Sequence, residues 1–399
     1  MTCTREQDMI ERSLTRYFQE LARQFQVVTL LGPRQSGKTT LCRAAFPGWG
    51  YVNLELPTNR QLAAQDPSLF FKQFPPPVVI DEAQRTPELL SHIQVMVDEK
   101  KQAGQFILTG SHQPRLVEGI SQSLAGRTAI LTLLPFSIAE LTAAGVTFDR
   151  DEYIFTGFLP RIYDQSLPPT RVYEDYYRTY VERDVRLIMN ISNQLAFEMF
   201  VKLLAGRVGQ VVNLHSLAGD IGVSATTLKS WLSVLEASFI TFRLPCYYNN
   251  FGKRITKAPK IYFTDVGLAA HLLGIESLSQ VARDPLLGGL FENMVVIEAL
   301  KARYNAGKPA NLYYFRGQNG VEVDLILDWA RRLYLFEIKA SMTADPSFAR
   351  HLLHFMKDVS AVEAAHVLYA GQDWPGRGYS FAHFSDTERL VTEVGQNIP

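Results

Sequence analysis

The segment GPRQSGKT, from Gly32 to Thr39, restricts the possible fold more than any other part of the sequence. It matches the pattern G-x-x-x-x-G-K-[ST], follows the apolar run QVVTLLG and precedes a stretch with the spacing of an amphipathic helix. In such a loop the glycines allow backbone N–H groups to surround a phosphate, and the following helix points its N-terminus at the anion. We therefore expect a nucleotide-binding strand, loop and helix here, with the helix beginning at Lys38.

The same loop predicts which residues contact ATP and its metal ion. The ammonium group of Lys38 is expected to neutralise the β- and γ-phosphate oxygens, and the hydroxyl group of Thr39 to bind Mg²⁺. The ATP-binding residues predicted in this way are Gly32, Pro33, Arg34, Gln35, Ser36, Gly37, Lys38, Thr39 and Thr40.

A second motif, VVIDEAQ, places two acids directly after an apolar strand. Open α/β sheets bind ligands at the carboxyl ends of their strands, so Asp81 is expected to hold Mg²⁺ through water and Glu82 to orient or deprotonate the attacking water. Seen alone, adjacent acids after an apolar run are usually solvated turn residues. Lys38 upstream and the strand YVNLEL between the two motifs favour hydrolysis instead, and that inserted strand indicates the additional-strand class of P-loop ATPases, which includes the AAA+ proteins.

Several further polar residues are candidates for contacts to the γ-phosphate. Thr109 and Ser111 end the strand run FILTGS and are either sensors of the phosphate or the polar start of a loop. Arg127, in SLAGRTAIL, is either an arginine finger that reaches a neighbouring subunit or part of an ordinary ion pair. Arg178 and Arg183 are alternatives for that contact, and their spacing of five residues places them on different faces of a helix, so that at most one serves it.

Length and charge limit what else the chain contains. With 399 residues it exceeds one ordinary core of ~100–200 residues, so several structural units are expected. The net charge is zero, so a nucleic-acid partner would have to be held by local patches. No stretch approaches the ~18 apolar residues of a membrane span, and the N-terminus lacks the pattern of a secretion signal. We expect a cytoplasmic protein without a membrane partner.

The order of patterns along the chain predicts its domains. Short β-branched runs alternate with helical stretches in the first part, which predicts a parallel sheet with helices on its faces. A helical stretch rich in Tyr and Arg follows, then two short helices joined at IGVS and a β-rich segment. The predicted domains are an N-terminal helix (1–25), a P-loop ATPase core (26–148), a helical lid (149–193), a winged helix-turn-helix (194–287) and a C-terminal domain (288–399).

Eight motifs together resemble those of one protein family: GPRQSGKTT, VVIDEAQ, ILTGS, SLAGR, LPRIY, YVERDVR, KIYFTDVGL and EVDLIL…FEIKAS. They are similar to motifs of bacterial and archaeal AAA+-type ATP-binding proteins that carry a C-terminal domain of unknown function, and the resemblance spans nearly the whole chain. It implies an α/β fold in which an AAA+-type, additional-strand P-loop sheet is joined to a helical lid, a winged helix and a C-terminal PD-(D/E)xK nuclease-like α/β domain. The AAA+ class further implies a homo-oligomer, with a hexamer expected.

The winged helix is the predicted contact to DNA. In SATTLKSWLSVLEAS, leucines at i, i+4 and i+7 form a buried stripe, which leaves free the polar residues Thr226, Thr227, Lys229 and Ser230. The segment 239–264 has no acid, and its basic and aromatic residues are Arg243, Lys253, Arg254, Lys257, Lys260, Tyr247 and Tyr248. Such a basic wing fits a nucleic-acid surface. Alternatively, the winged helix is a lid or a protein-binding element.

The C-terminal stretch EVDLILDWARRLYLFEIKAS carries an acid on one strand and acid-x-Lys on the next. Glu337 and Lys339 occupy alternate positions and therefore share a face of their strand. With its order α-β-β-β-α-β, the region resembles type II restriction enzymes and archaeal Holliday-junction resolvases, which implies Mg²⁺ held by Asp324 and Glu337 and an attacking water positioned by Lys339. Glu292 lies where resolvase-like members carry a helical metal ligand. The weaker candidates are Glu298 and Glu322.

Charged residues at a strand edge also protect against unwanted edge pairing, and such a domain could keep its fold without cutting. Three hypotheses follow. The first is a Mg²⁺-dependent AAA+-type ATPase that acts on DNA, including branched or junction DNA. The second is an ATP-gated regulatory or scaffold protein whose C-terminal part binds a protein partner without catalysis. The third is a structure-specific endonuclease that ATP licenses.

Overall fold

The structure is a computed structural model that describes residues 9–111, 120, 123–185, 193–248, 258–317 and 320–394. The chain forms two compact units, which we describe separately. The first consists of Met1–Phe136 with the short segments Ala237–Phe239 and Tyr304–Lys308, and the second of the remaining chain. Their folds follow different strand topologies.

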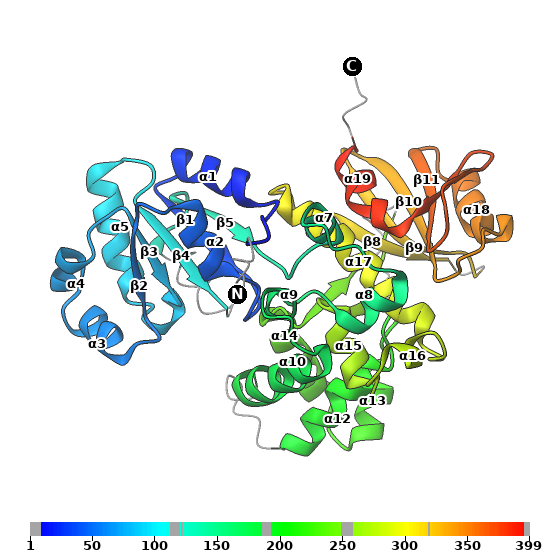
Figure 1. The fold of residues 1–399 in the computed structure, drawn as a ribbon, viewed down its shortest axis with the longest axis horizontal. Coiled ribbons are helices and arrows are strands. Elements are labelled where there is room, and N and C mark those ends of the chain that lie inside the picture. The colour runs from blue at the N-terminus through cyan, green and yellow to red at the C-terminus, as the bar shows by residue number, and fades with distance from the viewer. Residues whose placement is uncertain are drawn as a thin grey trace, which may run out of the picture. The chain divides into compact units, whose positions relative to one another are not determined.

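The first unit is built on a five-stranded parallel sheet with the order β2-β3-β4-β1-β5 (Figure 1). Its strands are β1 (Val27–Leu31), β2 (Gly50–Asn53), β3 (Val78–Asp81), β4 (Phe106–Gly110) and β5 (Thr128–Thr132). Its helices are α1 (Thr15–Gln24), α2 (Lys38–Ala45), α3 (Pro57–Gln65), α4 (Pro67–Gln73) and α5 (Leu89–Lys100). This is the parallel P-loop sheet that the sequence predicts, and α2 begins at Lys38 as expected.

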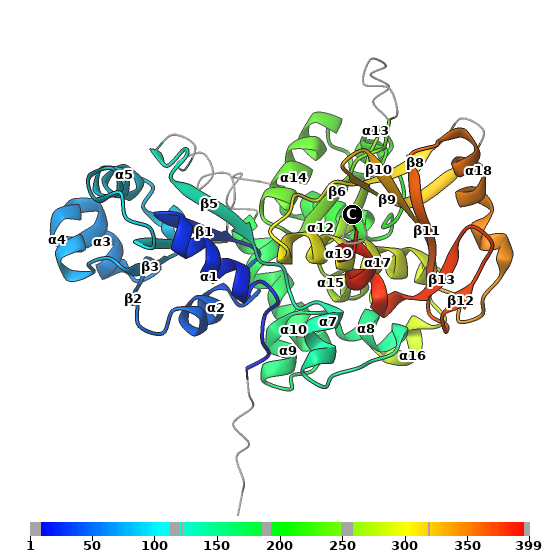
Figure 2. The ribbon, with the colours of Figure 1, turned by 90° about the horizontal axis from the view of Figure 1, so that it is seen from above.

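Apolar side chains of α1 and α2 cover one face of this sheet. Phe18 and Leu21 of α1 join Leu41 of α2 and Val28 of β1 in one buried cluster. Figure 2 shows these two helices on one side of the sheet and α5 on the other. The N-terminal helix is shorter than the segment 1–25 predicted from sequence, because within the described chain it begins only at Thr15.

The second unit opens with short helices. They are α7 (Ile138–Ala143), α8 (Arg150–Thr156), α9 (Pro160–Asp164), α10 (Pro169–Tyr176) and the π-helix Tyr177–Val185. The next elements are α12 (Gln194–Ala205), α13 (Leu214–Ile221), α14 (Ala225–Ala237), β6 (Thr241–Leu244), β7 (Lys260–Phe263), α15 (Val266–Leu272) and α16 (Leu278–Val281). Strands β6 and β7 are antiparallel. This is the order of elements that a winged helix requires, and its identity as one remains a prediction.

The rest of the second unit is a six-stranded sheet with the order β12-β13-β11-β10-β9-β8. Its elements are α17 (Leu287–Asn305), β8 (Leu312–Arg316), β9 (Glu322–Trp329), β10 (Arg332–Lys339), α18 (Arg350–Asp358), β11 (Val362–Tyr369), β12 (Trp374–Pro375), β13 (Ser380–His383) and α19 (Thr387–Thr392). Figure 2 shows α17 and α18 on opposite faces of this sheet. Val323 and Leu335 pack with Leu352 of α18 in one buried cluster.

A tight turn fixes the register of β9 and β10. Ala330 and Arg331 both have positive φ, 51° and 67°, and they connect Trp329 to its partner Arg332. Two left-handed residues give the twist that suits a two-residue hairpin. The pairing continues to Leu325 and Phe336, so the next residues along each strand are Asp324 and Glu337.

His366, on β11, should make the stability of this sheet decrease at acid pH. Its ring stacks on Phe336, Nδ1 shares a hydrogen bond of 2.7 Å with Ser380, and burial, with Arg389 nearby, lowers its pKa to about 4 from the ordinary 6.5. The imidazole of His366 binds a proton more readily in the unfolded chain than in the folded chain. Its contribution to the stability of the fold is therefore complete above the ordinary pKa and is lost as the pH falls toward 4. From about pH 7 to about pH 5 we expect a loss of about 2 kcal/mol, measured by thermal unfolding.

The variant His366→Gln keeps a hydrogen-bonding group but cannot titrate, so its unfolding temperature should fall less steeply in this pH range. His92→Gln is the control, because His92 is exposed on α5. Equal pH slopes for wild type and His366→Gln would contradict the assignment.

Candidate functional site

The loop between β1 and α2 has the backbone geometry of an anion cradle. Gly37 precedes α2 in a left-handed conformation with φ 90°, which glycine adopts without steric cost, and Gln35 also has a positive φ. A Cβ atom on Gly32 would lie 2.1 Å from the carbonyl oxygen of Leu133, so no side chain fits there. Successive backbone N–H groups at a helix N-terminus are suited to bind phosphate.

Lys38 is folded back onto this loop. It is 6 % exposed, and its Nζ donates to the carbonyl oxygens of Gly32 at 2.9 Å and Pro33 at 2.7 Å. Burial lowers the pKa of Lys38 to about 8, while the carboxylates of Glu82 and Asp81 act in the opposite direction. The sequence predicts that this ammonium group binds phosphate oxygens. In this structure carbonyl oxygens of the loop hold it instead.

Asp81, at the end of β3, collects three hydroxyl groups. Its Oδ2 accepts hydrogen bonds from Thr39 at 2.7 Å and Tyr51 at 2.6 Å, and its Oδ1 accepts one from Thr109. The carboxylate is 3 % exposed. A carboxylate and a threonine hydroxyl are oxygen ligands of the kind Mg²⁺ takes, alongside phosphate and water. The structure therefore brings the two predicted metal ligands together, and the donor set fits this ion.

Glu82 directly follows β3 in a left-handed conformation. Its Oε2 accepts hydrogen bonds from Gln84 at 2.5 Å and Ser111 at 3.2 Å, and its backbone N–H donates to Thr109 at 3.3 Å. The two residues predicted as sensors thus touch the two acids of the VVIDEAQ motif. The end of β4, which the sequence predicts to sense the phosphate, thus contacts the carboxylate predicted to activate water.

The arginines predicted to reach a nucleotide are held in exposed ion pairs. Arg127 makes a two-pronged contact with Asp98 of α5, at 2.6 Å and 2.9 Å. Arg178 pairs with Glu174 one helical turn earlier, at 2.6 Å. The side chain of Arg183 lies outside the described residues. Exposed pairs contribute little stability, so these two arginines can exchange partners at small cost.

The contacts of two residues at this site, Arg12 and Tyr51, were not predicted from the sequence. Arg12 is buried, and its guanidinium donates to the carbonyl oxygens of Ser36 at 2.7 Å and Leu134 at 2.6 Å. It joins the segment before α1 to the phosphate loop. Neither Arg12 nor Tyr51 lies in a recognisable motif, so only the folded chain reveals them.

In the C-terminal sheet, the predicted acid and acid-x-Lys residues come together from the adjacent strands β9 and β10. Lys339 Nζ lies 2.6 Å from Glu337 Oε1 and 3.5 Å from Asp324 Oδ2. Asp324 Oδ2 also accepts a hydrogen bond of 2.9 Å from the backbone N–H of Ile338. The other oxygen of the Glu337 carboxyl, Oε2, is buried without a hydrogen-bond partner. A divalent cation would satisfy this oxygen, so the residues fit one.

Lys260, the first residue of β7, also belongs to this cluster, which corrects its assignment to an exposed basic wing. It is 2 % exposed, and its Nζ lies 2.9 Å from Glu292, 2.8 Å from Glu322 and 3.8 Å from Asp324. The neighbouring carboxylates explain the burial, because an ammonium group enters a protein interior only when it is paired. We call the four carboxylates of Glu292, Glu322, Asp324 and Glu337, together with Lys260 and Lys339, the acidic cluster.

Crowding shifts the proton affinities of the acidic cluster. Burial, together with the charge of Asp324, raises the pKa of Glu337 to about 8 and that of Glu292 to about 7. The pKa of Lys260 is raised, since the three carboxylates outweigh the lowering effect of burial. Among the described residues, no three His, Cys, Asp or Glu side chains are placed to hold a metal ion together. The lysines lie between the carboxylates.

Glu298, a weaker candidate, lies in a separate network. It pairs with Lys301 at 2.7 Å and accepts a hydrogen bond from the backbone N–H of Ile138 at 2.8 Å. Both partners lie outside the acidic cluster. Glu298 therefore ties α17 to the start of α7.

The predicted DNA-contacting residues are described only in part. On α14, Leu228, Leu232 and Leu235 are buried, and Thr226 and Lys229 are exposed, as the pattern predicts. Thr227 hydrogen-bonds Ser224 through its backbone N–H at 3.0 Å. The remaining basic candidates lie outside the described residues: Lys253, Arg254 and Lys257.

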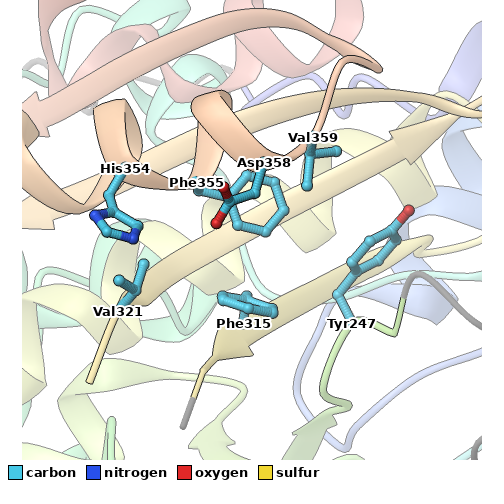
Figure 3. A pocket seen from close by; sticks show the side chains of 7 residues that line it. All are labelled: Tyr247, Phe315, Val321, His354, Phe355, Asp358 and Val359. Carbon is cyan, nitrogen blue, oxygen red and sulfur yellow. The ribbon is translucent and has the colours of Figure 1, made fainter. Parts of the chain in front are cut away.

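Tyr247, which the sequence assigns to the basic wing, packs on β8. Its ring packs against Tyr313 of β8, and its backbone N–H donates to the carbonyl of Tyr314 at 2.6 Å. It lines a cavity of about 220 Å³ between α18 and β8 (Figure 3). The cavity also borders Phe315 and Phe355, and none of the residues that line it belongs to the acidic cluster.

No helix in the described parts of the chain has the length and apolar character needed to cross a bilayer.

Three family models match the chain in succession. Residues 24–142 match the AAA domain, residues 147–279 match a Domain of unknown function (DUF8612), and residues 287–383 match a Domain of unknown function (DUF4143). The first match covers the phosphate loop and the VVIDEAQ motif, and the third covers the carboxylates of the acidic cluster. Lys260 lies in the region of the second match.

Two curated relatives are similar to most of the chain. Uncharacterized protein Rv2008c of Mycobacterium tuberculosis and Uncharacterized protein Mb2031c of Mycobacterium bovis are each 33% identical over 350 residues, covering 87% of this chain and 77% of the relative. Among solved structures, the Walker-type ATPase PABY2304 of Pyrococcus abyssi is similar at a TM-score of 0.41 and 17% identity, over 67% of this chain and 97% of that one. The RuvB Holliday junction branch migration motor of Thermotoga maritima is similar at a TM-score of 0.31 and 20% identity, over 59% and 90%.

Proposed function

The chain belongs to the family of these two mycobacterial proteins and is an ATPase of the P-loop AAA class, and from this premise we propose that it hydrolyses ATP with Mg²⁺ and uses the cycle to act on DNA. The observation that carries the hydrolysis is the contact set at the end of β3. There Asp81 bonds Thr39 of the phosphate loop and Thr109 of β4, beside Glu82. The proposed metal ligands Thr39 and Asp81 are thus in contact with each other. Thr109, the proposed phosphate sensor on β4, contacts both Asp81 and the backbone of Glu82, the proposed base.

The chain's own residues divide the work of hydrolysis. Lys38 leaves the carbonyl oxygens of the loop to bind phosphate oxygens, and Thr39 and Asp81 hold the ion. Bound Mg²⁺ neutralises charge that develops on the phosphates. Glu82 accepts a proton from the attacking water, and Ser111 and Gln84 orient its carboxylate.

We also propose a homo-oligomer, in which Arg127 serves the nucleotide of a neighbouring subunit. Its present partner, Asp98, is exposed, so the guanidinium can change partners without uncovering a buried charge. An arginine in this role stabilises charge on the transferring phosphoryl group. A hexamer is the assembly that the AAA+ class leads us to expect.

The exposed face of α14 supports the proposed contact to DNA. Thr226 and Lys229 lie there, while the apolar side of the helix is buried. A lysine that neutralises one phosphate releases counterions, so the binding constant depends on salt concentration.

The test is the ATP turnover of the full chain with linear duplex, single-stranded and four-way junction DNA. We expect one of these to stimulate turnover, with salt-sensitive binding. The variant Lys229→Gln should lower the slope of log affinity against log salt by about 0.9, the share of one phosphate. Lys72→Gln, an equal charge change on exposed α4, is the control. Turnover unaffected by every DNA, without salt-sensitive binding, would favour the scaffold hypothesis.

A second candidate function, metal-dependent cleavage of a phosphodiester, is favoured by one specific observation. Asp324, Glu337 and Lys339 come from adjacent strands and meet on one face, with Glu337 Oε2 buried and unpartnered. Asp324 and Glu337 would hold a divalent ion, which activates water and stabilises charge on the phosphate. Lys339 would position that water or the phosphate. ATP hydrolysis in the first unit would then license cutting by this cluster.

A further inference from the structure

The acidic cluster is divided between two lysines that share one carboxylate. Lys339 contacts Glu337 and Oδ2 of Asp324. Lys260 contacts Glu292, Glu322 and Oδ1 of Asp324. The two sides of the Asp324 carboxylate therefore face different cations, and each lysine lies where several carboxylate oxygens converge.

The two lysines differ in how firmly they are held. The side chain of Lys339 is 34 % exposed and can move aside, whereas that of Lys260 is 2 % exposed. Strand β7, which carries Lys260, is fastened to α17, because the Asn293 amide bonds both the backbone N–H and the carbonyl of Phe263, at 2.7 Å and 2.8 Å. Tyr262 adds a hydrogen bond of 2.6 Å to Glu292.

We infer that Lys260 is a resident cation that occupies the second cation position of the acidic cluster, so that the cluster takes a single divalent ion, between Asp324 and Glu337. Two-metal sites that process phosphodiesters place their ions about 3.5–4 Å apart and bridge them with a shared carboxylate. Asp324 lies in the corresponding bridging position here, and the ammonium group of Lys260 takes the place of the second ion. The inference rests on the proposed metal-dependent cleavage for the identity of the first ion.

The first position offers a carboxylate oxygen without a hydrogen-bond partner, whereas the carboxylates of the second position are paired with Lys260. Glu337 Oε2 has no partner, so an ion bound there gains a ligand that the protein leaves unsatisfied. At the second position Lys260 already satisfies carboxylates from α17 and β9. Moving it would leave buried charges without a counterion, which is strongly unfavourable.

The test counts Mn²⁺ ions bound by the full chain without nucleotide, from the electron paramagnetic resonance of free Mn²⁺. Wild type is expected to bind one ion that Asp324→Asn removes, which separates this ion from any at the phosphate loop. Lys260→Met keeps the length of the side chain without its charge, and should bind two ions that depend on Asp324. Lys301→Met is the matched control, since Lys301 is equally buried and pairs with Glu298 outside the cluster.

Circular dichroism checks the fold of each variant, and Lys260→Gln replaces Lys260→Met if the latter does not fold. The inference would be overturned if the folded Lys260 variants bound no more Asp324-dependent ions than wild type, or if wild type itself bound two. If wild type binds no such ion while a Lys260 variant gains one, cleavage by the wild-type cluster fails as a proposal, but the role of Lys260 stands.

Discussion

Glu82→Gln should leave ATP bound but lower the rate of ATP turnover by about 10²- to 10⁴-fold, the usual contribution of a general base. The amide has the size of the carboxylate and can still bond Ser111, but it cannot take a proton from water. The contacts of Asp81 with Thr39 and Thr109 stay intact, so binding of Mg²⁺ and ATP should change little. Steady-state turnover and the affinity for a fluorescent ATP analogue measure the two quantities separately.

Glu88→Gln is the control for this change, because Glu88 is exposed and lies only six residues further along the chain. Lys38→Ala provides the complementary result, in which ATP binding is lost together with turnover. Unchanged turnover in both Glu82→Gln and Lys38→Ala would remove the assigned ATP site. Loss of binding in Glu82→Gln would assign Glu82 to the binding of the nucleotide.

Asp324→Asn should abolish metal-dependent cleavage of DNA, with a fall of at least about a hundredfold, since even groups behind metal ligands are worth 10- to 100-fold. The amide can still accept the hydrogen bond from Ile338, so the strand pairing should persist. It no longer offers a charged oxygen to the ion, and it leaves Lys260 and Lys339 with one acid fewer. The measurement is nicking of junction and linear DNA with Mg²⁺ or Mn²⁺, in the presence of ATP.

Asp328→Asn, the same chemical change at the far end of β9, is the control. Asp328 lies four residues beyond Asp324 on the same strand and pairs with Leu333 of β10. Equal nicking by wild type and Asp324→Asn would assign the activity to a contaminating nuclease. No nicking by wild type, with ATP turnover intact, would leave the ATPase as the activity of this chain.

Features that are local in the sequence were predictable. The phosphate loop, its flanking strand and helix, and the acids after β3 lie in short segments whose patterns define strand ends and a helix start. The shared face of Glu337 and Lys339 also follows from alternation, because the two residues are two positions apart on one strand. The parallel P-loop sheet is confirmed in the structure, and the geometry brings Asp81, Thr39 and Thr109 together as the motifs suggest.

Features that depend on contacts between distant segments were not predictable. Lys260 lies in a run of basic residues without an acid, so composition alone suggests a solvated surface. Its burial results from carboxylates on α17 and β9, which come much later in the chain. Tyr51 likewise reaches Asp81 only because β2 and β3 are neighbours in the sheet. A single sequence gives no signal of such pairings beyond the chemical need of a buried charge for a partner.

The attachment of β7 to α17 also affects where the chain can be cut to obtain a fragment that folds. A fragment that begins at residue 287, where the last family match begins, would contain Glu292, Glu322 and Asp324 but not the ammonium group that neutralises them. It would also expose the side of α17 on which Asn293 receives the backbone of Phe263. We therefore expect that the C-terminal sheet does not fold alone when it is cut at this boundary, and that a stable fragment needs the chain from β6 onward.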